Sequence, residues 1–213
     1  MSVYHTFKHK TLTVVEIPLT DDEIKECLEM GKERTKLDEK KLGWKYRHDG
    51  MVSELAHAIG FMGEKAVEKW LDSKGLKRDI DYVVGERFVE RREEVRQDYV
   101  IWGKEIGVKS AKNRSLDEAT SFGTFLYPAK KHPDESKRLL GYPEYLVQTV
   151  VDMDGKRCWL YGYVSRHAIT ASPIKSIVRK PAHMIPVAQY KSVEGLLQIL
   201  KIDSPVLLEP IGS

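Results

Sequence analysis

Apolar and polar residues follow patterns along this chain that predict both strands and helices. Between Tyr4 and Ile17 the two kinds of residue alternate, which predicts a β-hairpin or an edge extension of a sheet. Thr20 and Glu23 have the spacing of a capping box, and the apolar stripe after them predicts a helix that fades in the charged run 36–41. We therefore expect residues 1–50 to form an N-terminal hairpin and helix extension.

A second helix and five strands are predicted downstream. The helix spans about Val52 to Leu71, where apolar residues recur every three or four positions and share one face. The predicted strands cover Tyr82 to Val89, Val95 to Trp102, Glu105 to Ser110, Tyr145 to Asp152 and Arg157 to Tyr163. The connection Leu116 to Pro143 is expected to be irregular, and a last helix is predicted near Val193 to Leu200.

This order of elements predicts an α/β fold with a mixed central β-sheet flanked by helices. The chain has 213 residues, of which 41% are hydrophobic, so it is long enough for one sizeable core. No linker divides it, and we expect one domain over residues 1–213 with its core at 51–200. No apolar run is long enough to cross a membrane and the N-terminus carries no secretion signal, so we expect a cytoplasmic protein with no membrane partner.

The basic residues are distributed unevenly, although the formal net charge is only +3. Between Lys156 and Lys191 there are seven Lys and Arg residues and no Asp or Glu. Such a stretch needs counterions, and DNA phosphates and a solvated basic face are both open interpretations. Cys27 and Cys158 have no metal-site spacing, so we expect two reduced core cysteines. The chain has one Asn and four Gln, and this shortage of thermolabile amides is typical of a hot environment.

An acid and a lysine flank a predicted hairpin. Asp98 begins one strand, where Asp is disfavoured, and Lys109 ends the other. Glu64 lies on the flank of the second helix near Gly60 and Gly63, which cost helix stability and are best explained by the close approach of a strand. Each residue has an ordinary explanation too: a helix-flank ion pair for the glutamate, a turn cap for the aspartate and a strand-end position for the lysine. As an ordered set they indicate a metal-dependent nuclease site.

Several short motifs together resemble the PD-(D/E)XK, or restriction-endonuclease-like, nuclease superfamily. The motifs are Gly63-Glu64, Asp98, Val108-Lys109-Ser110, Gln148 and Tyr161 to Arg166, over about residues 50 to 200. The chain is also similar to nuclease-like proteins of crenarchaeal viruses, which agrees with its amide-poor composition and implies the cytoplasm of a host cell. The resemblance implies a restriction-endonuclease-like core and a metal-dependent DNA endonuclease, with branched or junction DNA as one substrate by analogy.

The resemblance also implies a role for each matched residue. Asp98 would be the central ligand of Mg²⁺ or Mn²⁺, Glu64 a supporting ligand, and the Val108 carbonyl would complete the metal shell. Lys109 would orient the attacking water and stabilise the developing charge, and Gln148 would help to position the site. Cleavage of two strands needs two active sites, so we expect a homodimer.

The chain departs from the family at position 107. Gly107 stands where the family carries a second metal-binding acid, two residues before Lys109. Glu105 lies on the same strand face, about 7 Å further along, and is the candidate substitute ligand. Three interpretations stay open: a migrated ligand, a weak or partner-completed site, and a nuclease fold that has lost catalysis. The alternative functions are therefore a DNA-binding protein without turnover and a viral structural or interaction protein.

Side chains outside these motifs are candidates for contact with DNA. The basic candidates are Lys112, Arg114, Arg166, Lys175, Arg179 and Lys180. Among the aromatic residues, Phe122, Phe125 and Tyr127 either stack on unpaired bases or pack the long connection. The histidines share no spacing, and we expect His57 and His183 to lie on the surface or to face DNA.

Overall fold

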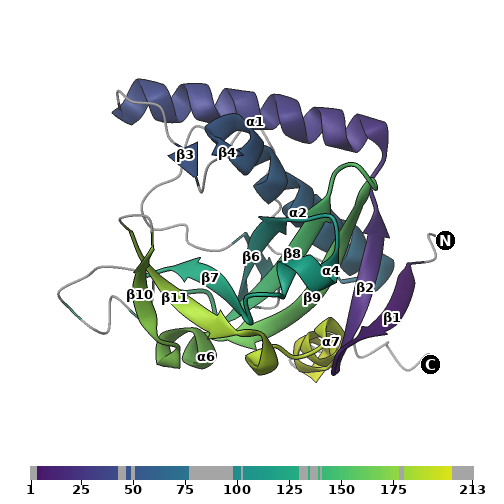
Figure 1. The fold of residues 1–213 in the computed structure, drawn as a ribbon. Helices are drawn as coiled ribbons and strands as arrows, with labels where there is room; N and C mark the ends of the chain where they lie inside the picture. The colour runs from purple at the N-terminus through teal and green to yellow at the C-terminus, as the bar shows by residue number, and fades with distance from the viewer. Residues whose placement is uncertain are drawn as a thin grey trace, which may run out of the picture.

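The central element is a mixed six-stranded β-sheet (Figure 1). The computed structural model describes residues 4–42, 47–48, 51–76, 98–101, 103–129, 134, 139, 141–177 and 180–202 of the chain. The strands of the sheet are β1 (His5–His9), β2 (Leu12–Pro18), β5 (Tyr99–Ile101), β6 (Lys104–Lys112), β8 (Tyr145–Asp152) and β9 (Arg157–Ser165). They lie in the order β1-β2-β9-β8-β6-β5, and neighbouring strands are antiparallel except for the parallel pair β6 and β8. The fold is therefore α/β, as the pattern predicts.

Helices cover one face of this sheet. α2 (Ser53–Ser73) lies against the strands, and α7 (Val193–Ile202) contacts β2 and β9. α1 (Asp21–Leu42) packs along α2 at the top of the view in Figure 1. The hydrophobic core on this face includes Val67, Trp70, Val147, Val151 and Leu160.

A three-stranded sheet covers the opposite face. Its strands are β10 (Ile174–Ile177), β11 (Lys180–Pro186) and β7 (Thr124–Pro128), in that order. Short helices accompany it: α4 (Leu116–Ala119), α6 (Arg166–Ala171) and the 3₁₀ helix η1 (Val187–Gln189). The core between the two sheets includes Phe125, Leu146, Val150, Tyr161 and Ile185. A small ribbon of β3 (Arg47–His48) and β4 (Met51–Val52) precedes α2.

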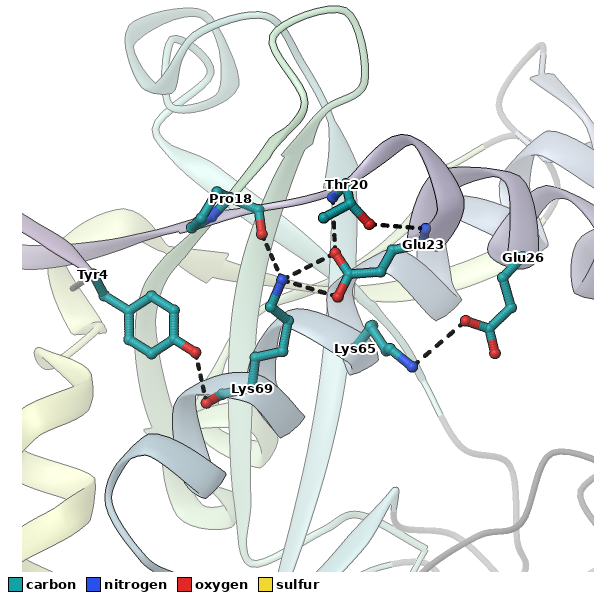
Figure 2. A network of polar contacts seen from close by, with 7 residues as sticks. All are labelled: Tyr4, Pro18, Thr20, Glu23, Glu26, Lys65 and Lys69. Carbon is teal, nitrogen blue, oxygen red and sulfur yellow. Dashed lines mark hydrogen bonds and ion pairs between the residues drawn. The ribbon is translucent and has the colours of Figure 1, made fainter. Parts of the chain in front are cut away.

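A polar network holds the start of α1 against α2 (Figure 2). The capping box forms as predicted: the Thr20 N–H donates to Glu23 Oε2 (2.8 Å), and the Glu23 N–H donates to Thr20 Oγ1 (3.2 Å). Lys69 of α2 donates to the same Glu23 carboxylate (2.9 Å) and to the Pro18 carbonyl (2.8 Å). Burial alone would raise the pKa of Glu23, but these hydrogen bonds and the Lys69 charge outweigh it and hold the pKa below its ordinary value.

Most predicted elements are confirmed, and the long connection is the main error. The N-terminal hairpin, α2, β8 and α7 lie where the pattern predicts them. α1 continues through the charged run 36–41 to Leu42, so its predicted end is wrong. The connection 116–143 contains α4 and β7, because its aromatic residues pack into the core between the sheets. α6, β10 and β11 lie in a stretch for which the pattern predicts no element.

Three further expectations have separate outcomes. The predicted strand Tyr82 to Val89 lies outside the described residues, and the strand predicted after it is described only over 98–101. Cys27 and Cys158 are buried free thiols, as expected, and burial raises the pKa of each to about 12. In the part of the chain that the structure describes, none of the helices combines the length and the apolar character needed to span a membrane.

Candidate functional site at the edge of β6

Among the described residues, strand β6 is paired by β8 along most of its length and by β5 only at its start. β8 pairs with residues 106–112, whereas β5 pairs with residues 104–106. Side chains alternate between the two faces of a strand. Ile106 belongs to the core under α2, so Gly107 and Lys109, on the other phase of the alternation, face the second sheet.

Asp98 lies at this edge, directly before β5. Its backbone N–H donates to the Ile106 carbonyl (3.0 Å), and its carboxylate accepts from the Val108 N–H. The N–H and C=O of one strand residue point toward the same neighbour, so the Val108 carbonyl faces this edge as well. Burial raises the pKa of the Tyr127 phenol, and the nearby Asp98 carboxylate adds to the rise. Two oxygen donors, one carboxylate and one carbonyl, therefore share the edge.

A pocket of about 550 Å³ lies beside this edge, between α2 and the second sheet. Its lining includes His57 and Ile59 of α2, residues 109–113 of and after β6, residues 124–126 of β7, and Gln148 of β8. Lys109 and Gln148 lie opposite each other in register, so the predicted catalytic lysine and the predicted positioning amide share this pocket. Gln148 is 1% exposed, so it forms a buried part of the pocket lining, the pocket floor. Its amide donates to the Thr149 carbonyl (2.9 Å).

Glu64 lies on α2, and its backbone is bound to the hairpin. The Tyr99 hydroxyl donates to the Glu64 carbonyl (2.7 Å), which joins this turn of α2 to β5. Gly63 allows the approach because a Cβ there would overlap the Ser110 hydroxyl, as expected for a glycine beside a strand. Among the described residues, no strand lies within 4 Å of the equivalent position at Gly60, so the described part of the chain does not support the same explanation there. The Glu64 turn thus contacts the hairpin, whereas Glu64 itself is not part of the pocket lining.

Gly107 and Glu105 share one face near the start of β6. Packing explains the glycine, and an ion pair holds the glutamate. A Cβ at position 107 would lie 2.7 Å from Cγ of Pro143, which is too close for van der Waals contact. An acid in place of Gly107 therefore requires Pro143 to move. The Glu105 carboxylate accepts from Nη2 of Arg166 (2.6 Å), and Nε of Arg166 donates to the Tyr142 carbonyl (2.8 Å). The candidate substitute ligand is thus held in an ion pair.

Carboxylates of the chain itself neutralise several cations of the acid-free stretch. Lys156 pairs with Asp21 (2.9 Å), and Arg157 pairs with Asp152 (3.1 Å). Arg166 is held by the ion pair described above. These three cations do not require phosphates as counterions, so the argument from the acid-free stretch is wrong for them.

The other basic candidates for DNA contact differ in their surroundings. Lys112 is exposed at the end of β6 and lines the pocket, and Lys175 is exposed on β10. Arg114 is exposed and pairs with an exposed aspartate at 3.2 Å. Arg179 and the side chain of Lys180 lie outside the described residues.

Two histidines have surroundings that sequence spacing does not indicate. His57 lines the pocket, and Thr35 Oγ1 lies 3.2 Å from its Nδ1 and orients the ring. The sequence signal that could have identified His57 is its position two helical turns before Glu64, on the same helix. His183 is 3% exposed, so the expectation of a surface position is wrong. Its Nε2 lies 2.8 Å from the Tyr142 hydroxyl in a buried pair.

Among the residues that the structure describes, few side chains near this edge are suited to bind a metal ion. Within the described ranges, no group of three or more His, Cys, Asp or Glu side chains could hold a metal ion. The oxygen donors at the edge of β6 are instead Asp98 and the Val108 carbonyl.

Comparisons of the chain with protein-family models, with curated proteins and with solved structures found no match.

Proposed function

We propose that this protein is a DNA endonuclease with a restriction-endonuclease-like core that uses Mg²⁺ or Mn²⁺ to hydrolyse phosphodiester bonds. The observation that carries the proposal is the meeting of Asp98, the Val108 backbone and Lys109 at one strand edge beside a pocket. The order of elements supports it: α2 is followed by the β5–β6 hairpin, and a crossover then leads to the parallel strand β8.

The oxygen donors at this edge fit a hard divalent cation that the substrate helps to hold. Mg²⁺ is commonly bound through one or two carboxylates and substrate phosphates, and it keeps several waters. Asp98 would supply a carboxylate and Val108 a carbonyl oxygen. Glu64, whose turn Tyr99 joins to β5, is the proposed supporting ligand. When bound, the cation would activate a water molecule and polarise a phosphoryl oxygen.

Residues of the pocket supply the remaining chemistry. Lys109 follows Val108 directly, and its ammonium would orient the attacking water and stabilise negative charge on the phosphate. Gln148 supports the floor beside it. Lys112 is exposed and lines the same pocket, so it would contact a further phosphate of the bound strand. Glu105 is not a proposed ligand, because Arg166 already holds its carboxylate.

A DNA-binding protein without turnover is the second candidate, and Gly107 is the observation that favours it. The Pro143 ring occupies the space beside Gly107, so the strand carries no acid there. A site with fewer charged ligands binds Mg²⁺ more weakly, whereas contacts between Lys112 and phosphates do not depend on the metal.

Cleavage assays separate the two candidates. Purified protein is incubated with supercoiled plasmid, single-stranded DNA and a four-way junction in Mg²⁺ or Mn²⁺, beside Lys109→Ala and the control Lys8→Ala, an exposed lysine on β1 at the opposite edge of the sheet. The endonuclease proposal predicts nicking that Lys109→Ala loses and Lys8→Ala retains. Nicking that survives in Lys109→Ala, or no cleavage of any substrate, overturns it. DNA binding with a steep salt dependence then supports the second candidate.

A homodimer is part of the endonuclease proposal, because cleavage of both strands needs two sites related by symmetry. Light scattering on the purified protein, with and without junction DNA, measures the mass of the assembly. A monomer in both conditions contradicts this part of the proposal and limits the enzyme to nicking.

A further inference from the structure

Phe122 is a phenyl ring held in solvent at the turn between α4 and β7. Its relative exposure is 90%. Among the described residues, the other large hydrophobic side chain that is exposed is Ile174, at 50%. An exposed ring forgoes the stabilisation that burial of apolar surface provides. Folding alone therefore gives no reason for a phenylalanine at this position.

The turn that carries Phe122 is fixed by hydrogen bonds on both sides. The Gly123 N–H donates to the Thr120 carbonyl (3.0 Å), and the Ser121 hydroxyl donates to the Glu118 carbonyl (2.8 Å). The Val187 N–H donates to the Gly123 carbonyl (2.9 Å), which ties the turn to η1. The ring is thus presented on a held backbone, so little ordering is needed before it can bind.

The turn stands at the rim of the pocket that contains Lys109. Ala119 and Thr124, which lie on either side of the turn, both line that pocket. Figure 1 labels α4 and β7, the two elements that this turn connects. The neighbouring aromatic residue Phe125 has the opposite environment, since it is 5% exposed and packs against the ring of Tyr161. Of the two roles considered for the aromatic residues, packing therefore applies to Phe125. Phe122 faces outward and is available for stacking.

We propose that Phe122 stacks on an unpaired base of bound DNA while the phosphates of the same strand lie against Lys109 and Lys112. The inference rests on the proposed function and narrows its substrate class to DNA with unpaired bases. Every base offers a π-face for such stacking, whereas the bases of an intact duplex are already stacked on each other. The exposed acids Asp117 and Glu118 on α4 repel phosphates, which favours contact of this turn with a base. The pocket volume of about 550 Å³ suits a nucleotide-sized ligand.

Binding measurements without divalent metal test the inference separately from cleavage. Fluorescein-labelled single-stranded DNA, the duplex of the same sequence and a four-way junction are titrated in EDTA with the wild-type protein, Phe122→Ala, Phe122→Trp and Ile174→Ala. Phe122→Ala should weaken binding of single-stranded and junction DNA by about 5- to 150-fold and leave duplex binding unchanged. Phe122→Trp should retain binding, with tryptophan fluorescence quenched by single-stranded DNA. Ile174→Ala, the matched exposed hydrophobic residue, should bind as the wild type does.

The outcomes distinguish this inference from the proposed function. If the wild-type protein binds DNA but Phe122→Ala retains its single-strand affinity, or loses duplex affinity equally, the stacking inference is overturned and the proposed function stands. If the wild-type protein binds none of the three DNAs, both are overturned. Unchanged thermal stability of Phe122→Ala is the check that a loss of binding comes from the ring.

Discussion

The two ends of strand β6 carry charged side chains in different surroundings. At the N-terminal end, Glu105 accepts a hydrogen bond from Arg166 at 2.6 Å, so both charges are neutralised within the protein. At the C-terminal end, Lys109 and Lys112 line a pocket of about 550 Å³. Anionic groups of a ligand fit the second environment and not the first.

Gly107 and Pro143 separate these two environments. Glu105 and Lys109 share one strand face and lie about 13 Å apart along it. Between them this face of the strand has no side chain, because it holds Gly107, on which the Pro143 ring packs directly. The neighbours of a charged residue, more than its type or its register, therefore decide whether it supports the fold or faces a ligand.

The largest effect should come from Asp98, whose carboxylate lies beside the pocket end of β6. Removing its charge should lower the cleavage rate far more than removing the charge of Glu105 at the other end. Asp98→Asn keeps an oxygen that accepts from the Val108 N–H, but it removes the charge of the proposed metal ligand, so cleavage should fall by about 100-fold or more. Glu105→Gln should leave cleavage unchanged. Initial nicking rates in Mn²⁺, for variants shown to have similar thermal stability, measure the difference. Equal losses would mean that both ends of β6 belong to one site.

Substitution of Gly107 tests what keeps the ends apart. A Cβ 2.7 Å from Pro143 forces the ring or the strand to shift. Overpacking of this kind costs about 1–3 kcal/mol of the free energy of unfolding, so Gly107→Ala should be destabilised by that amount. Pro143→Ala removes the clash, and the double variant should recover most of the loss. Urea denaturation of the four proteins gives the coupling as a double-mutant cycle, and strictly additive losses would rule out the clash.

The sequence predicts the parts of this site that depend on neighbouring residues. The hairpin follows from two strand-forming runs around a turn at Gly103, whose φ of 75° suits glycine. The mixed sheet follows from the long crossover between two of the predicted strands. Local patterning suffices for the hairpin and for the class of sheet, whereas the register that places Lys109 opposite Gln148 is seen only in the structure.

The parts that could not be predicted depend on contacts between distant segments. The pair of Glu105 and Arg166 joins residues 61 positions apart, and no local pattern signals it. The acid-free stretch therefore indicated more cations in need of counterions than the fold has. The connection after β6 combines aromatic residues with Pro and Gly, and only the core between the sheets decides that Phe125 packs while Phe122 is exposed.

A smaller effect separates Lys112 from Arg166 in DNA binding. Lys112→Ala should reduce the slope of log affinity against log salt by about 1, because one phosphate contact is lost. Arg166→Ala should leave that slope unchanged, since Glu105 already holds the guanidinium, and should instead lower the free energy of unfolding by about 1 kcal/mol. Fluorescence anisotropy over a series of KCl concentrations measures the slopes. A reduced slope in Arg166→Ala would show that DNA displaces the ion pair.

The smallest expected effect concerns charges that, like Glu105, support the fold: the capping network of α1. The pKa of Glu23 is held below its ordinary value of 4.5, so the folded state binds this proton less readily than the unfolded state does. The stabilisation is complete above that ordinary value and is lost as the pH falls through the lower pKa of the folded state. Because Glu23 is partly exposed, we expect less than about 1 kcal/mol. Urea denaturation should show Glu23→Gln less stable than the wild type at neutral pH and equal to it in acid. A difference that persists in acid would assign the effect to packing of the side chain instead of its charge.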